Sequence, residues 1–128
     1  MRVLSIDYGQ KKIGIAFSET IIAEPYSVLR YQSEELVIEK ILEIIKLLNI
    51  EKVIVGVSEG ISAEKSKSFG KKLSTRINID LEFVDETLTT KEAQKYSIEA
   101  GIRRIKRRQL EDAYAATIML QWYLEKNV

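Results

Sequence analysis

The chain opens with MRVLSIDYGQKKIGIAFS, residues 1–18. Two apolar runs flank a turn that contains Tyr8-Gly9, which predicts a β-hairpin with strands at residues 2–7 and 12–18. The first run ends in Asp7, and an ionised carboxylate beside a core is costly unless it is paired or bound to a metal. The opening stretch therefore predicts both the start of a sheet and a functional carboxylate at the end of its first strand.

The rest of the chain alternates between strand and helix patterns. Apolar runs and two-residue alternation predict three further strands, at residues 21–31, 53–57 and 79–86. The first of these contains Pro25, which predicts a bend and suits an edge position. Capping residues and four-residue apolar spacing predict helices at residues 33–49, from Ser62 to 77, from 89 onward and at 113–124. Short turns make the first three strands antiparallel, and helical crossovers make the last two parallel to the first. The pattern predicts a mixed five-stranded α/β sheet with helices on both faces, in a single domain spanning residues 1–128.

Composition narrows the chemistry that this chain can perform. Its 128 residues are 45% hydrophobic, enough to bury a core without disulfide or metal staples. The absence of cysteine and histidine excludes zinc–thiolate sites, cysteine nucleophiles, serine–histidine triads and histidine general bases. The amino terminus lacks the pattern of a signal peptide and no stretch approaches the length of a membrane span, so we expect a cytoplasmic protein with no membrane partner.

Three acidic positions follow predicted elements where a metal site could form. Asp7 ends the first strand, Glu86 with its neighbour Asp85 ends the last strand, and Asp112 lies in the first turn of the closing helix. Sites in such sheets gather at the carboxyl ends of the parallel strands. Carboxylates are ligands for hard ions, and two such ions activate water and stabilise the leaving oxygen of a phosphodiester without a histidine base. The pattern predicts Asp7, Glu86 and Asp112 as catalytic, metal-holding residues for Mg²⁺ or Mn²⁺, with Asp85 as the open alternative to Glu86.

Each acid also has a purely structural interpretation. Asp7 could form the turn before Gly9, since Asp favours such turns. Asp112 could be favoured only by the helix dipole, and Asp85 and Glu86 could be solvated charges at a strand end. Their coincidence at one predicted edge of the sheet is what favours a site.

A basic segment precedes the closing helix. Although the net charge is only +1, five cations fall within the six residues 103–108, namely Arg103, Arg104, Lys106, Arg107 and Arg108. Such a cluster predicts contacts to a phosphate backbone, with a solvated helix or loop face as the alternative. Lys11 and Lys12 in the hairpin turn could extend the same nucleic-acid-binding surface.

Three stretches carry a resemblance to a known family. LSIDYG at residues 4–9, VDETLTTKEA at 84–93 and DAYAATIML at 112–120 resemble, in order, the signatures of the YqgF/RuvX family. That family is similar to the RuvC Holliday junction resolvases and shares the ribonuclease H-like fold. The resemblance implies a nuclease with Asp7, Glu86 and Asp112 as metal-holding carboxylates. Two departures, Gly56-Val57-Ser58 in place of Gly-Leu-Pro and Thr87 in place of the arginine of many members, bear on substrate preference and leave the carboxylates intact.

The leading hypothesis is a divalent-metal-dependent endonuclease acting on structured nucleic acid, which the resemblance narrows to processing of the 5′ end of pre-16S rRNA. A Holliday junction resolvase acting on branched DNA is the first alternative, and its symmetric substrate would call for a homodimer rather than a monomer. A phosphotransferase resembling sugar and acetate kinases is a second alternative, although those proteins need two such domains around the nucleotide. A nucleic-acid-binding assembly factor with weak or vestigial chemistry is the third.

Overall fold

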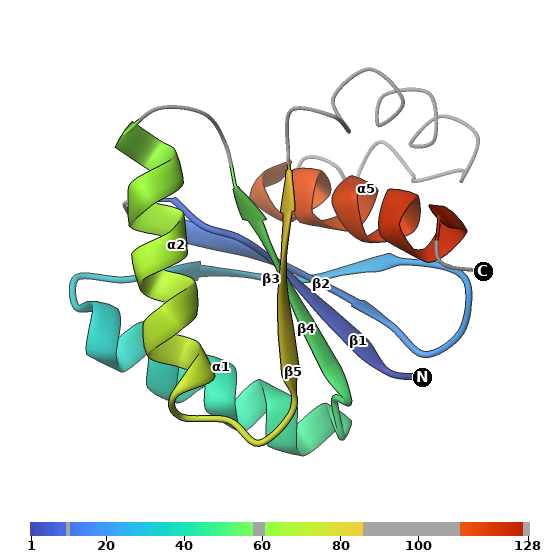
Figure 1. Ribbon diagram of the computed structural model, residues 1–128, viewed down its shortest axis with the longest axis horizontal. Coiled ribbons are helices and arrows are strands. Elements are labelled where there is room, and N and C mark those ends of the chain that lie inside the picture. Colours follow the sequence, from blue (N-terminus) through green and yellow to red (C-terminus); the bar gives the residue numbers. More distant parts are fainter. Residues whose placement is uncertain (10, 58–60, 86–110, 127–128) are drawn as a thin grey trace.

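The computed structural model describes residues 1–9, 11–57, 61–85 and 111–126, with the backbone alone at 61–62 and 111–112. Its centre is a five-stranded sheet in the order β3-β2-β1-β4-β5 (Figure 1). The strands are β1 Val3–Asp7, β2 Lys12–Ser18, β3 Glu24–Arg30, β4 Lys52–Val57 and β5 Asp80–Asp85. β1, β2 and β3 pair antiparallel, whereas β1 with β4 and β4 with β5 pair parallel. The predicted mixed sheet and its order of directions are confirmed.

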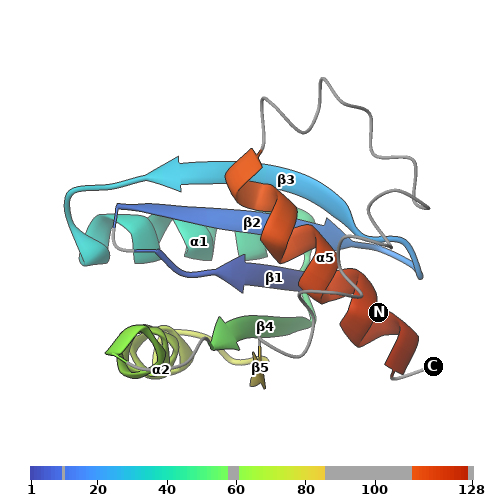
Figure 2. The same ribbon diagram turned by 90° about the horizontal axis from the view of Figure 1, so that it is seen from above.

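Helices cover both faces of this sheet, as predicted (Figures 1 and 2). The described helices are α1 Glu34–Leu48, α2 Ile61–Ser74 and α5 Glu111–Lys126. α1 and α2 pack on one face and α5 on the other. The helix predicted from residue 89 lies outside the described residues. None of the described helices is both long and apolar enough to cross a membrane.

The predicted helix starts are only partly correct. Ser33 holds the N-cap position of α1, but its side chain makes no capping hydrogen bond, and the N–H of Val37 instead bonds the Ser33 carbonyl at 3.2 Å. α2 begins at Ile61, so Ser62 lies inside the first turn and the prediction that it caps the helix is wrong. Sequence patterns place a helix end only to within a residue or two.

β3 is an edge strand, and its pairing with β2 is irregular at Pro25. Ile15 pairs with Ser27 while the next residue, Ala16, pairs with Pro25, so Tyr26 is the extra residue of a β-bulge. Proline cannot donate to a ladder and is therefore confined to edges and bulges. The predicted bend near Pro25 is confirmed.

Two apolar cores, one on each face, follow from strand alternation. Leu4 and Ile6 of β1 lie in the core beneath α1 and α2, whereas Val3 lies in the core beneath α5. Ser5 shares the face of Val3 and is fully buried, and its hydroxyl donates to the Ala116 carbonyl of α5 at 2.9 Å. Successive side chains of a strand point to opposite faces. Asp7, two residues further along β1, therefore lies on the α5 face.

A cluster of two charged side chains and a tyrosine joins the C-terminal part of α5 to the sheet. Glu82 Oε2 of β5 lies 2.8 Å from Lys52 Nζ of β4 and accepts a 2.8 Å hydrogen bond from the Tyr123 hydroxyl of α5. The Lys52 ammonium also lies 5.2 Å from the centre of the Tyr123 ring. The hydrogen bonds from Lys52 and then Tyr123 hold the pKa of Glu82 below its ordinary value, and the bond with Glu82 raises the pKa of Lys52.

This cluster predicts an acid-sensitive contribution to stability. A carboxyl whose folded pKa is depressed stabilises the fold above its unfolded pKa, and loses that effect as the pH falls through the folded pKa. Because the Glu82 side chain is 49% exposed, Glu82→Gln should lower the free energy of unfolding at pH 7 by no more than about 1 kcal/mol. Urea unfolding at about pH 7 and about pH 3 should show the difference disappearing in acid.

The exposed Asp80 at the start of the same strand offers a matched control, and Asp80→Asn should show a smaller pH-dependent difference. If Glu82→Gln lowers the free energy of unfolding equally at both pH values, the loss comes from packing and not from charge.

Candidate active site

Asp7 lies at the carboxyl end of β1, half-buried and paired in register with Gly14 of β2. The buried bond from Ser5 to Ala116 ties this strand to α5, whose N-terminal end points toward the carboxyl end of β1 (Figure 2). From Ser5 to Asp7 the strand advances about 7 Å. From Ala116 back to position 112 the helix retraces about 6 Å. Both steps run in the direction of the carboxyl end of β1, so Asp7 and the first turn of α5 lie toward the same end of the sheet.

β5 delivers its last described residue to the same edge but to the opposite face. Asp85 pairs in register with Val57 at the end of β4. Val84 is buried in the core beneath α5, while the Phe83 ring lies against Gly70 of α2. Alternation therefore places Asp85 with Phe83 on the α2 face, across the sheet from Asp7.

The structure describes the side chain of neither of the other two predicted metal ligands. Glu86 lies outside the described residues, and Asp112 is described only as a backbone position in the first turn of α5. Within the part of the chain that the structure describes, no three acidic side chains cluster. Asp7 is therefore the one predicted ligand whose side chain the structure places.

Only two of the cations predicted to bind nucleic acid belong to the described residues. Lys11 is exposed in the turn, and Lys12 is partly buried where β2 begins, in register with Arg30 of β3. Both lie on the hairpin that carries Asp7. The basic residues 103–108 lie outside the described residues.

The turn after Asp7 is held by two contacts from Tyr31. Its hydroxyl donates to the Gly9 carbonyl at 2.6 Å, and its N–H donates to the Lys11 carbonyl at 3.1 Å. A β-carbon at position 9 would run into the carbonyl oxygen of Lys12. Glycine is thus the residue that lets the chain double back directly after Asp7.

We expect Gly9→Ala to destabilise the protein by about 1–3 kcal/mol, because the new methyl group meets backbone that cannot rotate away. Urea unfolding measures the change. Gly70→Ala is the matched control, since its β-carbon would meet only the ring of Phe83, which is 36% exposed and can move. Alanine also suits the interior of α2 better than glycine. Equal losses in the two variants would contradict a rigid turn at Gly9.

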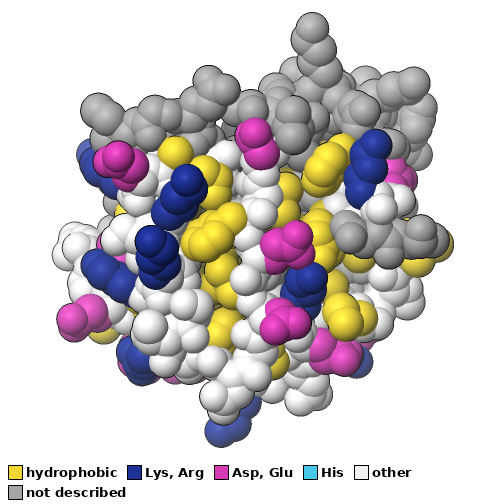
Figure 3. Space-filling view, viewed as in Figure 1, with side chains coloured by type: hydrophobic (Ala, Val, Ile, Leu, Met, Phe, Trp, Pro, Cys, Tyr) yellow, Lys and Arg dark blue, Asp and Glu magenta, His cyan; other side chains and the backbone are white. Residues whose placement is uncertain are grey.

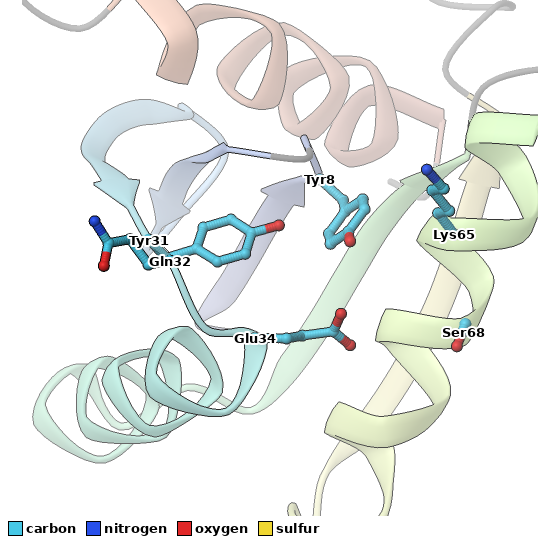
Figure 4. Close-up of a pocket in the computed structure, with 6 residues that line it drawn as sticks. All are labelled: Tyr8, Tyr31, Gln32, Glu34, Lys65 and Ser68. Atoms are coloured by element: carbon cyan, nitrogen blue, oxygen red, sulfur yellow. The ribbon is translucent and has the colours of Figure 1, made fainter.

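A pocket opens on the other face of the sheet, between α1 and α2 (Figure 4). Its volume is about 440 Å³, and its lining residues are Tyr8, Tyr31, Gln32, Glu34, Lys65 and Ser68. Sequence reasoning missed this pocket, because its walls come from three separate stretches of the chain. The one local signal is Tyr8, the residue that directly follows Asp7.

Comparison with known proteins places this architecture among nucleic-acid enzymes. A family model described as "RuvX: Holliday junction resolvase" matches residues 1–126. A protein of Caldanaerobacter subterraneus named "Putative pre-16S rRNA nuclease" is 40% identical, over 99% of this chain and 98% of its own. One of Lactococcus lactis subsp. lactis with the same name is 36% identical, over 98% and 95%.

Solved structures show the same fold at low identity. Thermus thermophilus RuvC, solved in complex with a Holliday junction substrate, superposes with a TM-score of 0.72 over 100% of this chain and 97% of its own, at 12% identity. The fowlpox virus resolvase in complex with Holliday junction DNA gives a TM-score of 0.57 over 100% and 99%, at 14% identity. The predicted ribonuclease H-like fold is confirmed.

Proposed function

Because this chain belongs to the RuvX family, we propose that it is a divalent-metal-dependent endonuclease that processes the 5′ end of pre-16S rRNA. The relatives named for pre-16S rRNA are similar in sequence along nearly their whole length, whereas the junction-bound RuvC shares the fold at 12% identity. The preference for an RNA substrate rests on that difference. The observation that carries the chemistry is the carboxylate of Asp7 at the catalytic edge of the sheet, on the face that α5 covers. We place the protein in the cytoplasm with this substrate.

We propose that Asp7, Glu86 and Asp112 hold the metal. Asp7 offers hard carboxylate oxygens, the ligands that Mg²⁺ and Mn²⁺ take in proteins. The pairing of β1 with β2 and the turn at Gly9 fix where this carboxylate lies, and the Ser5–Ala116 bond ties β1 to α5, whose first turn contains position 112. When bound, the ions would activate water and stabilise the leaving oxygen.

Strand alternation supports Glu86 over Asp85 as the ligand from β5. Asp85 lies on the α2 face, and the next residue of an extended chain lies on the α5 face with Asp7. We therefore assign the metal-holding role to Glu86 and a structural or solvated role to Asp85.

The cations of the hairpin and of the basic segment bind the substrate backbone in this proposal. Lys11 and Lys12 are carried by the same turn as Asp7, and residues 103–108 immediately precede α5 in the chain. Contacts to phosphate position a nucleic acid without reading its sequence. Choice of substrate must therefore come from shape or from contacts to bases.

Cleavage assays on two substrates test the proposal. A 5′-extended 16S rRNA transcript and a four-way DNA junction are each incubated with the protein and Mg²⁺ or Mn²⁺, and again with EDTA. We expect metal-dependent cleavage of the RNA near the mature 5′ end. Symmetric cleavage of the junction alone, by a dimer in solution, would replace the RNA substrate by branched DNA. Tight binding without cleavage of either substrate would overturn the nuclease proposal in favour of an assembly factor.

A further inference from the structure

The pocket between α1 and α2, called here the Tyr8 pocket, begins at the residue after the proposed metal ligand. Alternation along β1 sends Asp7 toward α5 and Tyr8 toward α1 and α2. The Tyr8 ring packs on Phe69, with ring centres 4.8 Å apart and planes inclined by 34°. Because Phe69 is fully buried, this contact gives Tyr8 a fixed support. Asp7 and Tyr8 thus lie next to each other in the chain on opposite faces of the sheet, so a nucleic acid that wraps around this end of the sheet could reach both.

The walls of the Tyr8 pocket combine aromatic rings with a few polar groups. The Tyr31 hydroxyl points toward the neighbouring Tyr8, and Lys65 and Ser68 line the other side of the pocket on α2 (Figure 4). Burial, followed by a hydrogen bond with Tyr8, raises the pKa of the Tyr31 phenol, so the hydroxyl stays protonated and keeps its bond to Gly9. The pocket volume of about 440 Å³ falls in the usual range for small-molecule sites, although the cavity is open and its lining is as polar as it is apolar.

Glu34 supplies an acceptor to this cavity. Its carboxylate points toward Tyr8 in Figure 4. Its buried Oε1 accepts no hydrogen bond within the described part of the chain, although Lys72 Nζ lies 3.2 Å away as an ion-pair partner. In Figure 4 the Gln32 amide points away from Glu34 and Tyr8, but the Ser68 hydroxyl of α2, which can both donate and accept, also lines the pocket. These groups match the hydrogen-bonding edge of a base better than they match a purely apolar ligand.

The surroundings of the pocket suit a phosphate backbone. Lysine and arginine side chains gather along α2 in Figure 3, and four of the lysines fall at positions 65, 67, 71 and 72. Lys65 and Lys67 are both exposed, but of the two only Lys65 lines the pocket. A positive surface beside an aromatic platform is the combination that proteins use to bind single-stranded nucleic acid.

We propose that the Tyr8 pocket takes up one unpaired nucleobase of the substrate, stacked against its tyrosines, with the adjoining phosphate on Lys65. The inference rests on the proposed nuclease function, which brings nucleic acid to Asp7. Unstacked bases of RNA loops and ends are the usual targets of aromatic side chains. The pocket thereby directs the enzyme toward single-stranded segments beside the cleaved bond, and supplies the base contact that phosphate binding lacks.

Fluorescence of a short single-stranded oligoribonucleotide that contains 2-aminopurine tests this proposal. The titration is run without divalent metal, so the result does not depend on cleavage. We expect quenching on binding, and a loss of affinity of roughly tenfold when Ser68→Leu fills the exposed rim of the pocket. Lys65→Ala should weaken binding more than Lys67→Ala, which removes the same charge from the same helix. The same sequence as a paired duplex should not respond to Ser68→Leu.

The outcomes separate this proposal from the nuclease proposal. Quenching and affinity unchanged in Ser68→Leu, or equal losses in the two lysine variants, would overturn the pocket even if the enzyme cleaves RNA. Pocket-dependent quenching in a protein that cleaves nothing would uphold base binding and overturn the nuclease. Urea unfolding of each variant verifies that the fold is intact.

Discussion

Asp7→Asn is expected to lower the rate of metal-dependent cleavage by roughly a thousandfold, since the loss of a metal-holding charge removes several kcal/mol of transition-state stabilisation. Asparagine has nearly the same shape as aspartate and can still accept hydrogen bonds, so the turn at Gly9 and the pairing with Gly14 should survive. The single-turnover rate on the RNA transcript, measured across a titration of Mg²⁺, tests the prediction. The variant should also require more Mg²⁺ for its residual activity.

Asp80→Asn is the matched control for this experiment. Asp80 is exposed and is the first residue of β5. Because β5 is parallel to β1, Asp80 lies where the strands begin, whereas Asp7 lies where β1 ends. Both substitutions remove one negative charge and keep the side-chain volume, so a general charge effect would appear in both variants. We expect Asp80→Asn to cleave at about the parent rate, because surface substitutions away from a site have small effects. A fully active Asp7→Asn enzyme would exclude Asp7 as a metal ligand.

The fold was predictable because its local signals agree with its global arrangement. The unbroken apolar run at residues 53–57 is typical of a strand covered on both faces, and Val53 and Val55 lie in one core while Ile54 lies in the other. Pro25 indicated an edge strand, and the structure places a bulge there. Where local signals are weak, prediction failed, as at Ser62, since a capping residue marks a helix end without fixing the turn in which it lies.

Of the three predicted metal ligands, only Asp7 has a side chain that the described part of the structure places. Asp7 stands out because it is an acidic residue at the end of an apolar strand, in a hairpin that the sequence itself predicts. The choice between Asp85 and Glu86 could not be made from sequence, because the alternation of β5 alone does not say which of its faces meets α5. The buried Val84 settles the face of Asp85.

Tertiary contacts between distant segments were beyond sequence reasoning. The Tyr8 pocket needs residues 8, 31–34 and 65–68 to converge, and the cluster of Lys52, Glu82 and Tyr123 needs the C-terminal part of α5 to reach β4 and β5. No spacing rule relates these stretches. Tyr123 itself is 7% exposed in the core beneath α5, so its ring packs there while its hydroxyl reaches Glu82.

Glu86→Gln and Asp85→Asn are expected to differ sharply although the two acids are neighbours in the chain. If Glu86 holds the metal, Glu86→Gln should lower the cleavage rate by a factor on the order of a thousand, for the same reason as Asp7→Asn. Asp85 lies with Phe83 on the α2 face, so Asp85→Asn should retain activity to within a few-fold. Each variant removes one carboxylate charge, so the pair is its own control. Single-turnover cleavage and Mg²⁺ binding by calorimetry should fall together in Glu86→Gln alone. A greater loss in Asp85→Asn would contradict the assignment from strand alternation and would make Asp85 the ligand.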